Sequence, residues 1–197
     1  MAWKPDYVTL AELKNFMHIF DTDDDASLAL DITAASRAVD NHCNRQFGKT
    51  DALEQRLYTA EVRDCRWVVD IDDLMTVTGL VVTITDVGTL TAFVKEPINA
   101  AQEARPWTRF VVDTTSTVKP TGKPYEVAIT ATWGWTATPV PVKEATRLQA
   151  SRFAARRNSP YGVAGSPDQG SELRLLSRVD PDVGVSLRGF RRARKVG

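Results

Sequence analysis

The spacing of apolar residues changes twice along this chain of 197 residues, and this change constrains its fold most. Near the N-terminus apolar side chains recur every three or four residues, which is the spacing of one helix face. From about Leu53 to Trp135 the apolar runs are short, rich in β-branched and aromatic residues, and separated by Asp, Gly, Pro or Thr. Such runs are typical of strands. Helical spacing returns after Pro141, so the pattern predicts helices interrupted by an inserted β domain.

Two helices are expected before the β domain. The segment TLAELKNFM begins with Thr9 and places Glu12 three residues later, which is a capping-box pattern. A second helix is expected from about Asp25 to Phe47, capped by the preceding Asp residues and stopped by Gly48. Its apolar stripe consists of Leu28, Ile32, Ala35, Val39 and Cys43.

The central region is interpreted as five or six antiparallel strands with one solvated face. The clearest alternation is that of Val127, Ile129, Ala131 and Trp133. Trp133 and Trp135 are expected to pack in a core rather than to bind a ligand.

Two prolines separate the last strand from a third helix. Pro139 and Pro141 cannot continue a central strand, whereas proline is tolerated in the first turn of a helix. This helix is expected to end near Asn158, before Pro160, with an apolar side made of Ala145, Leu148, Phe153 and Ala155.

The expected fold class is therefore α+β: a small helical bundle with an inserted antiparallel β domain and an extended C-terminal tail. Helices separated by the insertion must pack on one another to bury their apolar stripes. The expected segments are the N-terminal helices (1–52), the β domain (53–136), the third helix (137–158) and the tail (159–197).

A formal net charge of zero conceals an asymmetry. From Lys143 onward there are 12 basic and 5 acidic residues, a balance of +7, which leaves 13 basic and 20 acidic residues before it, a balance of −7. Such a chain can present opposite faces to different neighbours, including copies of itself. A solvated basic tail explains the same numbers equally well.

The residue types give little support for catalysis or metal binding. Cys43 and Cys65, expected in a helix and a strand, are interpreted as buried small hydrophobes rather than a disulfide, and no metal-ligand spacing occurs. Asp21, Asp23 and Asp25 match positions 1, 3 and 5 of an EF-hand loop, but the rest of the loop does not match. Position 6 is Ala26 where glycine is required, and position 12 is Ile32 where glutamate is required. Phosphate-binding and nucleophile-elbow motifs are absent.

One carboxylate cluster could serve acid–base chemistry. Asp70, Asp72 and Asp73 are interpreted instead as residues of strand ends and turns. The expectation is a protein that is not an enzyme and has no cofactor and no metal. No apolar run is long enough to span a membrane and no signal-peptide pattern is present, so synthesis in a cytoplasm is expected.

Several stretches, taken in order, resemble a known family. They are YVTLAELKNFM, DDDASLALDITAASRAVDNHCNRQFG with its Arg45–Gln46–Phe47 end, WGW, VPVKEATRLQASRFAARRNSPYGVAG and LRLLSRVDPDVGVSLRGFRR. Together they resemble the head-to-tail connector (adaptor) proteins of long-tailed bacteriophages, the head-completion group of gp6-like connectors. Both ends of the chain carry the resemblance, whereas the β insertion matches only in outline.

The resemblance implies a structural protein of the virion neck. Such adaptors form a homo-oligomeric ring, usually of twelve copies, that joins the portal protein to the next neck or tail protein and lets DNA pass without sequence recognition. The implied subunit interface includes Arg147, Arg152, Arg156 and Arg157. The implied portal-binding residues are Leu173, Leu175, Leu176, Val179, Arg188, Phe190, Arg191 and Arg192. Deletion after Gly170 is then expected to leave the body folded and to block portal attachment.

Three other functions remain open from the sequence. Another neck component, a head-closure or tail-terminator protein, would be mainly β, which the strong helix at 25–47 argues against. An enzyme with an unrecognised carboxylate site is a second alternative. A non-specific nucleic-acid-binding module that uses the basic end is a third, and it predicts steeply salt-dependent DNA binding.

Overall fold

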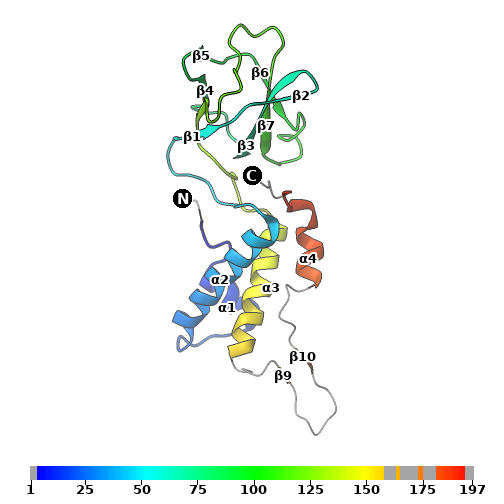
Figure 1. The fold of residues 1–197 in the computed structure, drawn as a ribbon. Coiled ribbons are helices and arrows are strands. Elements are labelled where there is room, and N and C mark those ends of the chain that lie inside the picture. The colour runs from blue at the N-terminus through cyan, green and yellow to red at the C-terminus, as the bar shows by residue number, and fades with distance from the viewer. Residues whose placement is uncertain (1–3, 158–162, 165–172, 175–180, 194–197) are drawn as a thin grey trace. The chain divides into compact units, whose positions relative to one another are not determined.

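The computed structural model describes residues 4–157, 163–164, 173–174 and 181–193. The chain divides into two compact units (Figure 1). The helical unit comprises Pro5–Phe47 and Thr138–Gly197, and the β unit comprises Gly48–Ala137 together with residues 1–4. The α+β fold class is confirmed, since helices and antiparallel sheets both occur.

The helical unit begins with α1 (Leu10–Met17) and its predicted capping box. The Thr9 hydroxyl accepts a hydrogen bond from the Glu12 backbone N–H at 3.2 Å, and the Glu12 carboxylate accepts one from the Thr9 backbone N–H at 2.7 Å. The hydrogen bonds that the Thr9 backbone N–H and hydroxyl donate to the Glu12 carboxylate hold the pKa of Glu12 below its usual value.

The second helix, α2 (Asp25–Cys43), ends earlier than predicted. Asn44 adopts the left-handed conformation with a φ of 51°, so Asn44 and not Gly48 terminates the helix. Asparagine tolerates this conformation better than most residues, so α2 ends at Asn44, before it reaches Gly48. The expected side-chain cap was also wrong, since Asp24 makes no capping bond, while Asp25 pairs with Lys14 at 2.5 Å.

The third helix, α3 (Val140–Arg157), begins at the predicted prolines but buries a different face from the one expected. Ala145 is buried as predicted, whereas Leu148 and Phe153 are half-buried and Ala155 is exposed. The buried positions are Val142, Ala145, Thr146, Gln149, Ala150 and Ala154. Small side chains let α3 approach α2 closely, and Ala150 and Ala154 join a core with Leu13, Leu28, Ile32 and Ala35.

The C-terminal part was expected to be extended throughout, which is wrong for residues 181–190. There α4 (Pro181–Leu187) is followed by a 3₁₀ turn, η2 (Arg188–Phe190). Val183 and Leu187 lie one helical turn apart, are fully buried, and α4 packs on α3. A single pair of apolar residues is too short a pattern to predict a helix from the sequence. The helix is stabilised by its packing on α3. Before α4, β9 (Val163–Ala164) pairs antiparallel with β10 (Leu173–Arg174).

The β unit contains eight strands, more than the five or six expected, in two four-stranded antiparallel sheets. One sheet has the order β1 (Glu54–Tyr58), β8 (Val127–Ala131), β4 (Val81–Ile84), β5 (Gly88–Thr89). The other has the order β2 (Glu61–Arg63), β3 (Arg66–Leu74), β7 (Trp107–Val112), β6 (Phe93–Glu96).

The core of the β unit contains the residues that the alternating pattern selected. Val127, Ile129, Ala131 and Trp133 are fully buried, and Trp135 is 3% exposed. The indole N–H groups donate to the Glu54 carbonyl at 2.9 Å and to the Asp73 carboxylate at 2.8 Å, respectively. Both tryptophans therefore serve packing, as expected.

The two cysteines differ in their surroundings. Cys43 is buried at the end of α2, as expected, and Cys65 is exposed. Asp64 and Cys65 both have positive φ and form the turn between β2 and β3, so the expected buried strand position of Cys65 was wrong.

Candidate functional site

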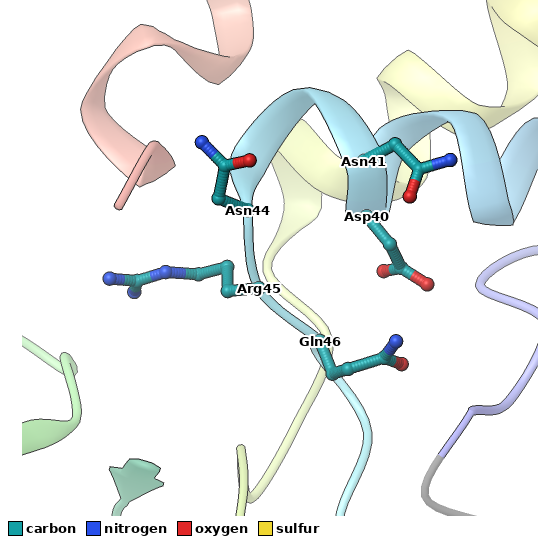
Figure 2. Close-up of a pocket in the computed structure, with 5 residues that line it drawn as sticks. All are labelled: Asp40, Asn41, Asn44, Arg45 and Gln46. Atoms are coloured by element: carbon teal, nitrogen blue, oxygen red, sulfur yellow. The ribbon is translucent and has the colours of Figure 1, made fainter. Parts of the chain in front are cut away.

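A pocket of about 590 Å³ lies at the C-terminal end of α2. In Figure 2 the side chains of Asp40 and Gln46 point to the same side, and Arg45 extends away from them. Asn41 and Asn44 complete the lining. The pocket thus presents one carboxylate, one guanidinium and three amides.

The carboxylate of this pocket is already engaged within the helical unit. The Tyr7 hydroxyl donates to Asp40 and accepts a hydrogen bond from the Phe47 backbone N–H at 3.0 Å, while Arg37 lies 3.3 Å from the second Asp40 oxygen. Burial, and then the bond to Asp40, raise the pKa of Tyr7 well above its usual value. Tyr7 thus joins the segment before α1 to the last turn of α2, at Asp40, and to the segment that follows α2, at Phe47. We call these contacts the Tyr7–Asp40 cluster.

The C-terminal segment, residues 181–193, joins the same cluster. The Phe190 ring meets the Phe47 ring edge-on at 6.0 Å, and Phe47 in turn meets Tyr7 at 5.8 Å. The Arg192 backbone N–H donates to the Cys43 carbonyl at 2.8 Å, and the Asn44 amide donates to the Arg192 carbonyl at 3.1 Å. The carbonyl groups at the C-terminus of α2 are therefore partly satisfied by the C-terminal segment.

The side chains that the sequence offers for catalysis, Cys43 and the three aspartates of β3, make structural contacts. Burial raises the pKa of the Cys43 thiol to about 11, so it is a thiol and not a nucleophilic thiolate at neutral pH. Asp70 pairs with Arg63 at 2.7 Å and with Arg109 at 3.0 Å. Asp72 pairs with Arg56 at 2.8 Å, and Asp73 accepts the Trp135 indole bond. The three carboxylates have separate cationic or donor partners rather than one shared proton.

Within the described ranges, no cluster of three or more His, Cys, Asp or Glu side chains has the arrangement of a metal site. In the same part of the chain, no helix combines the length and apolar character needed to cross a membrane.

The four arginines expected at a subunit interface lie along α3, and Arg147 and Arg157 contact side chains of their own chain. Arg157 lies 3.5 Å from Asp24 and 3.4 Å from Asp31 of α2. Burial raises the pKa of Asp31, against the opposing effect of Arg157. Arg147 pairs with Glu144 and stacks over the Phe16 ring at 4.4 Å. Arg152 and Arg156 are half-buried.

The residues expected to bind a portal protein fall into two groups. Leu175, Leu176 and Val179 lie outside the described residues, as does the side chain of Leu173. Arg188 and Arg191 are exposed, whereas Phe190 and Arg192 are half-buried against the end of α2. The contact between Tyr7 and Asp40 joins positions 33 residues apart without any periodic pattern, so no sequence signal predicts it.

Comparison with known proteins finds a likeness in fold. No protein-family model matches the sequence, and no curated protein matches it. A solved structure described as "Neck of empty GTA particle computed with C6 symmetry" contains a chain with a TM-score of 0.50 and 19% identity. The likeness covers 100% of this chain and 96% of that chain, so the two-unit α+β architecture is shared as a whole.

Proposed function

We propose that this protein is a structural component of the neck of a tailed phage or phage-like particle. The observation that carries the proposal is the likeness in fold to a chain of a particle neck over 100% of the present chain. At 19% identity the support comes from the shared architecture and not from shared residues. The order of the sequence motifs, which resembles the connector family, supports the same function independently.

The composition of the described site agrees with an assembly role. Asp70, Asp72, Asp73 and Cys43, the candidate catalytic groups among the described residues, are engaged in ion pairs, hydrogen bonds or packing. In this proposal charge contributes through the attraction between an acidic N-terminal portion and a basic C-terminal portion of neighbouring copies.

The more detailed proposal is a head-to-tail adaptor. Copies form a ring, twelve in number, which joins the portal to the next neck or tail protein and surrounds the DNA. The neck structure was computed with C6 symmetry, and twelve copies are compatible with that symmetry as two per repeat. Leu173 to Val179, with the exposed Arg188 and Arg191, are the proposed portal contacts.

Imaging tests this function directly. Purified protein is examined by negative-stain electron microscopy and light scattering, alone and after mixing with portal-bearing heads that lack their tails. The expected result is a ring at the portal vertex. Heads that never acquire added density at this vertex, with a protein that stays monomeric at every concentration, would contradict the proposal.

DNA binding distinguishes the nucleic-acid-binding alternative. A neck protein is expected to bind free DNA weakly, because its task is to surround DNA without recognising it. Tight binding by the isolated chain with a steep dependence on salt would favour the alternative instead.

A further inference from the structure

The order of the helices gives the helical unit two different outer sides. α3 packs against both α2 and α4, and Figure 1 shows α3 between them. α2 and α4 therefore cover α3 from different directions, and each turns its other side outward. A subunit in a closed ring needs two unlike surfaces of this kind, because each copy contacts its neighbours head to tail.

On its outward side α2 exposes several apolar side chains, together with Thr33 and the half-buried Arg37, whose guanidinium contacts Pro5 and Asp40. Ala26, Ala29, Leu30 and Ala34 are all exposed, and Leu30 is 72% exposed. An exposed helix face usually carries charged and polar side chains. Small side chains around one leucine are what a second helix needs to approach closely. We name these four residues the α2 outer face.

The outward side of α4 also exposes an apolar side chain next to a position without a side chain. Val185 is 75% exposed, and a Cβ atom added to Gly184 would have no atom within 4 Å. Glycine destabilises a helix interior by about 1 kcal/mol relative to alanine, and neither backbone strain nor packing against the described residues requires glycine at position 184. The open space beside Gly184 and Val185, the α4 outer face, fits the close approach of another backbone.

Charge favours contact between these two sides. Residues 5–47, which include α2, contain 3 basic and 8 acidic residues, a balance of −5. Residues 138–197, which include α3 and α4, contain 12 basic and 5 acidic residues, a balance of +7. Exposed Asp21 and Asp23 precede α2, and exposed Arg188 and Arg191 follow α4. Contact between like sides would bring like charges together, whereas the α2 side of one copy and the α4 side of another carry opposite charges.

We infer that the α2 outer face of one copy packs against the α4 outer face of the next copy, and that this contact closes the ring. The inference rests on the proposed function and deepens it by naming the subunit interface. It places the subunit interface on the α2 and α4 outer faces, in place of the α3 arginines that the sequence suggested.

Two variants test the contact, one on each face. Leu30→Arg and Val185→Glu each place a charge of the wrong sign in the interface, and both positions are exposed, so folding is retained. Each variant alone is expected to lose the ring and to elute as a monomer. Val62→Arg, at a 59% exposed position of β2, is the matched control and is expected to keep the ring.

Mixing the two variants makes the test specific. The Leu30→Arg copy keeps its α4 outer face, and the Val185→Glu copy keeps its α2 outer face. Where the two altered faces meet, the introduced arginine and the introduced glutamate carry opposite charges. The mixture is therefore expected to regain the association that each variant lacks alone, detected by native mass spectrometry. Gly184→Leu supplies a third measurement: its melting temperature is expected to stay the same or rise, while the ring is lost.

The possible results separate this inference from the proposed function. Rings that persist in Leu30→Arg and Val185→Glu, or a mixture that does not associate, would overturn the inference and leave the neck assignment intact. A wild-type chain that forms no ring, alone or on portal-bearing heads, would overturn both.

Discussion

The backbone at Gly134 has a φ of 104°, and a Cβ atom there would lie 2.0 Å from the carbonyl oxygen of Gly48. At this point the chain enters and leaves the β unit. The Trp135 N–H donates to the Gly48 carbonyl at 2.9 Å, and the Gly134 N–H donates to the Asp73 carbonyl at 2.7 Å. Only glycine combines this conformation with so close an approach of two backbones.

Gly134→Ala is expected to lower the free energy of unfolding of the β unit by at least about 2 kcal/mol, because the strained φ and the steric overlap add. Urea denaturation followed by tryptophan fluorescence measures this change, since Trp133 and Trp135 flank the site. Gly184→Ala, at an open helical position, is the control and is expected to cause no loss. Equal stability of the two variants would refute the explanation.

Glu126 is a second residue whose role can be measured. It is 3% exposed, and it accepts hydrogen bonds from the Thr121 N–H at 2.9 Å, the Thr121 hydroxyl at 2.6 Å and the Gly122 N–H at 2.7 Å. Burial alone would raise the pKa of Glu126, but these bonds outweigh it and the pKa is lowered from its ordinary value of 4.5.

Because the folded-state pKa lies below the unfolded-state pKa, the carboxylate of Glu126 stabilises the fold above pH 4.5, and this contribution is lost as the pH falls through the folded-state pKa. Glu126→Gln is expected to cost about 1–3 kcal/mol at pH 7. The difference from wild type should shrink at lower pH in urea titrations. Glu103→Gln, at an exposed position, should show neither effect.

At the scale of elements, α4 is the helix whose stability depends most on its packing. It has seven residues, too few for an isolated helix to persist in water. Val183 and Leu187 bury it against α3, and Phe190 and Arg192 fix the following residues to the end of α2. Deletion after Gly170 would remove these contacts, so the structure predicts a destabilised helical unit rather than an unaffected body.

Leu187→Ala is expected to lower the free energy of unfolding by about 2–5 kcal/mol, because it leaves a cavity between α4 and α3. Val185→Ala on the opposite side of the same helix should change it by less than about 0.5 kcal/mol. Thermal and urea unfolding of the full chain measure both. A small effect of Leu187→Ala would mean that α4 does not stabilise α3.

At the scale of the whole molecule, the two units have separate hydrophobic cores. The core of the β unit includes Phe110, Ile129 and Trp133, and that of the helical unit includes Leu13, Leu28 and Ile32. The two chain crossings into the β unit are bonded to each other, at Thr50 and Trp133 as well as at Gly48 and Trp135. An insertion closed in this way has the properties of an independent domain.

A fragment of residues 48–137 is therefore expected to fold alone, with one cooperative unfolding transition and a dispersed amide NMR spectrum. Removing Gly48 to Thr50 from the fragment should weaken it, because the bonds to Trp133 and Trp135 are lost. A fragment that shows no cooperative transition would refute the independence of the β unit.

The sequence alone determined the features that depend on local periodicity. The capping box at Thr9, the stripe of α2, the alternation from Val127 to Trp133 and the proline-led start of α3 all arise from neighbours in the chain, and they were predicted. The resemblance to connector proteins likewise came from the order of sequence stretches.

Tertiary structure decided what depends on contacts between distant segments. The buried face of α3, the formation of α4 and the Tyr7–Asp40 cluster each need a partner surface far away in sequence. Local propensity does not encode such a surface, because the free energy that selects among conformations comes from burying side chains against it. For the same reason, the packing of the helices on one another, and not the sequence alone, determines which residues of α2 and α4 stay exposed.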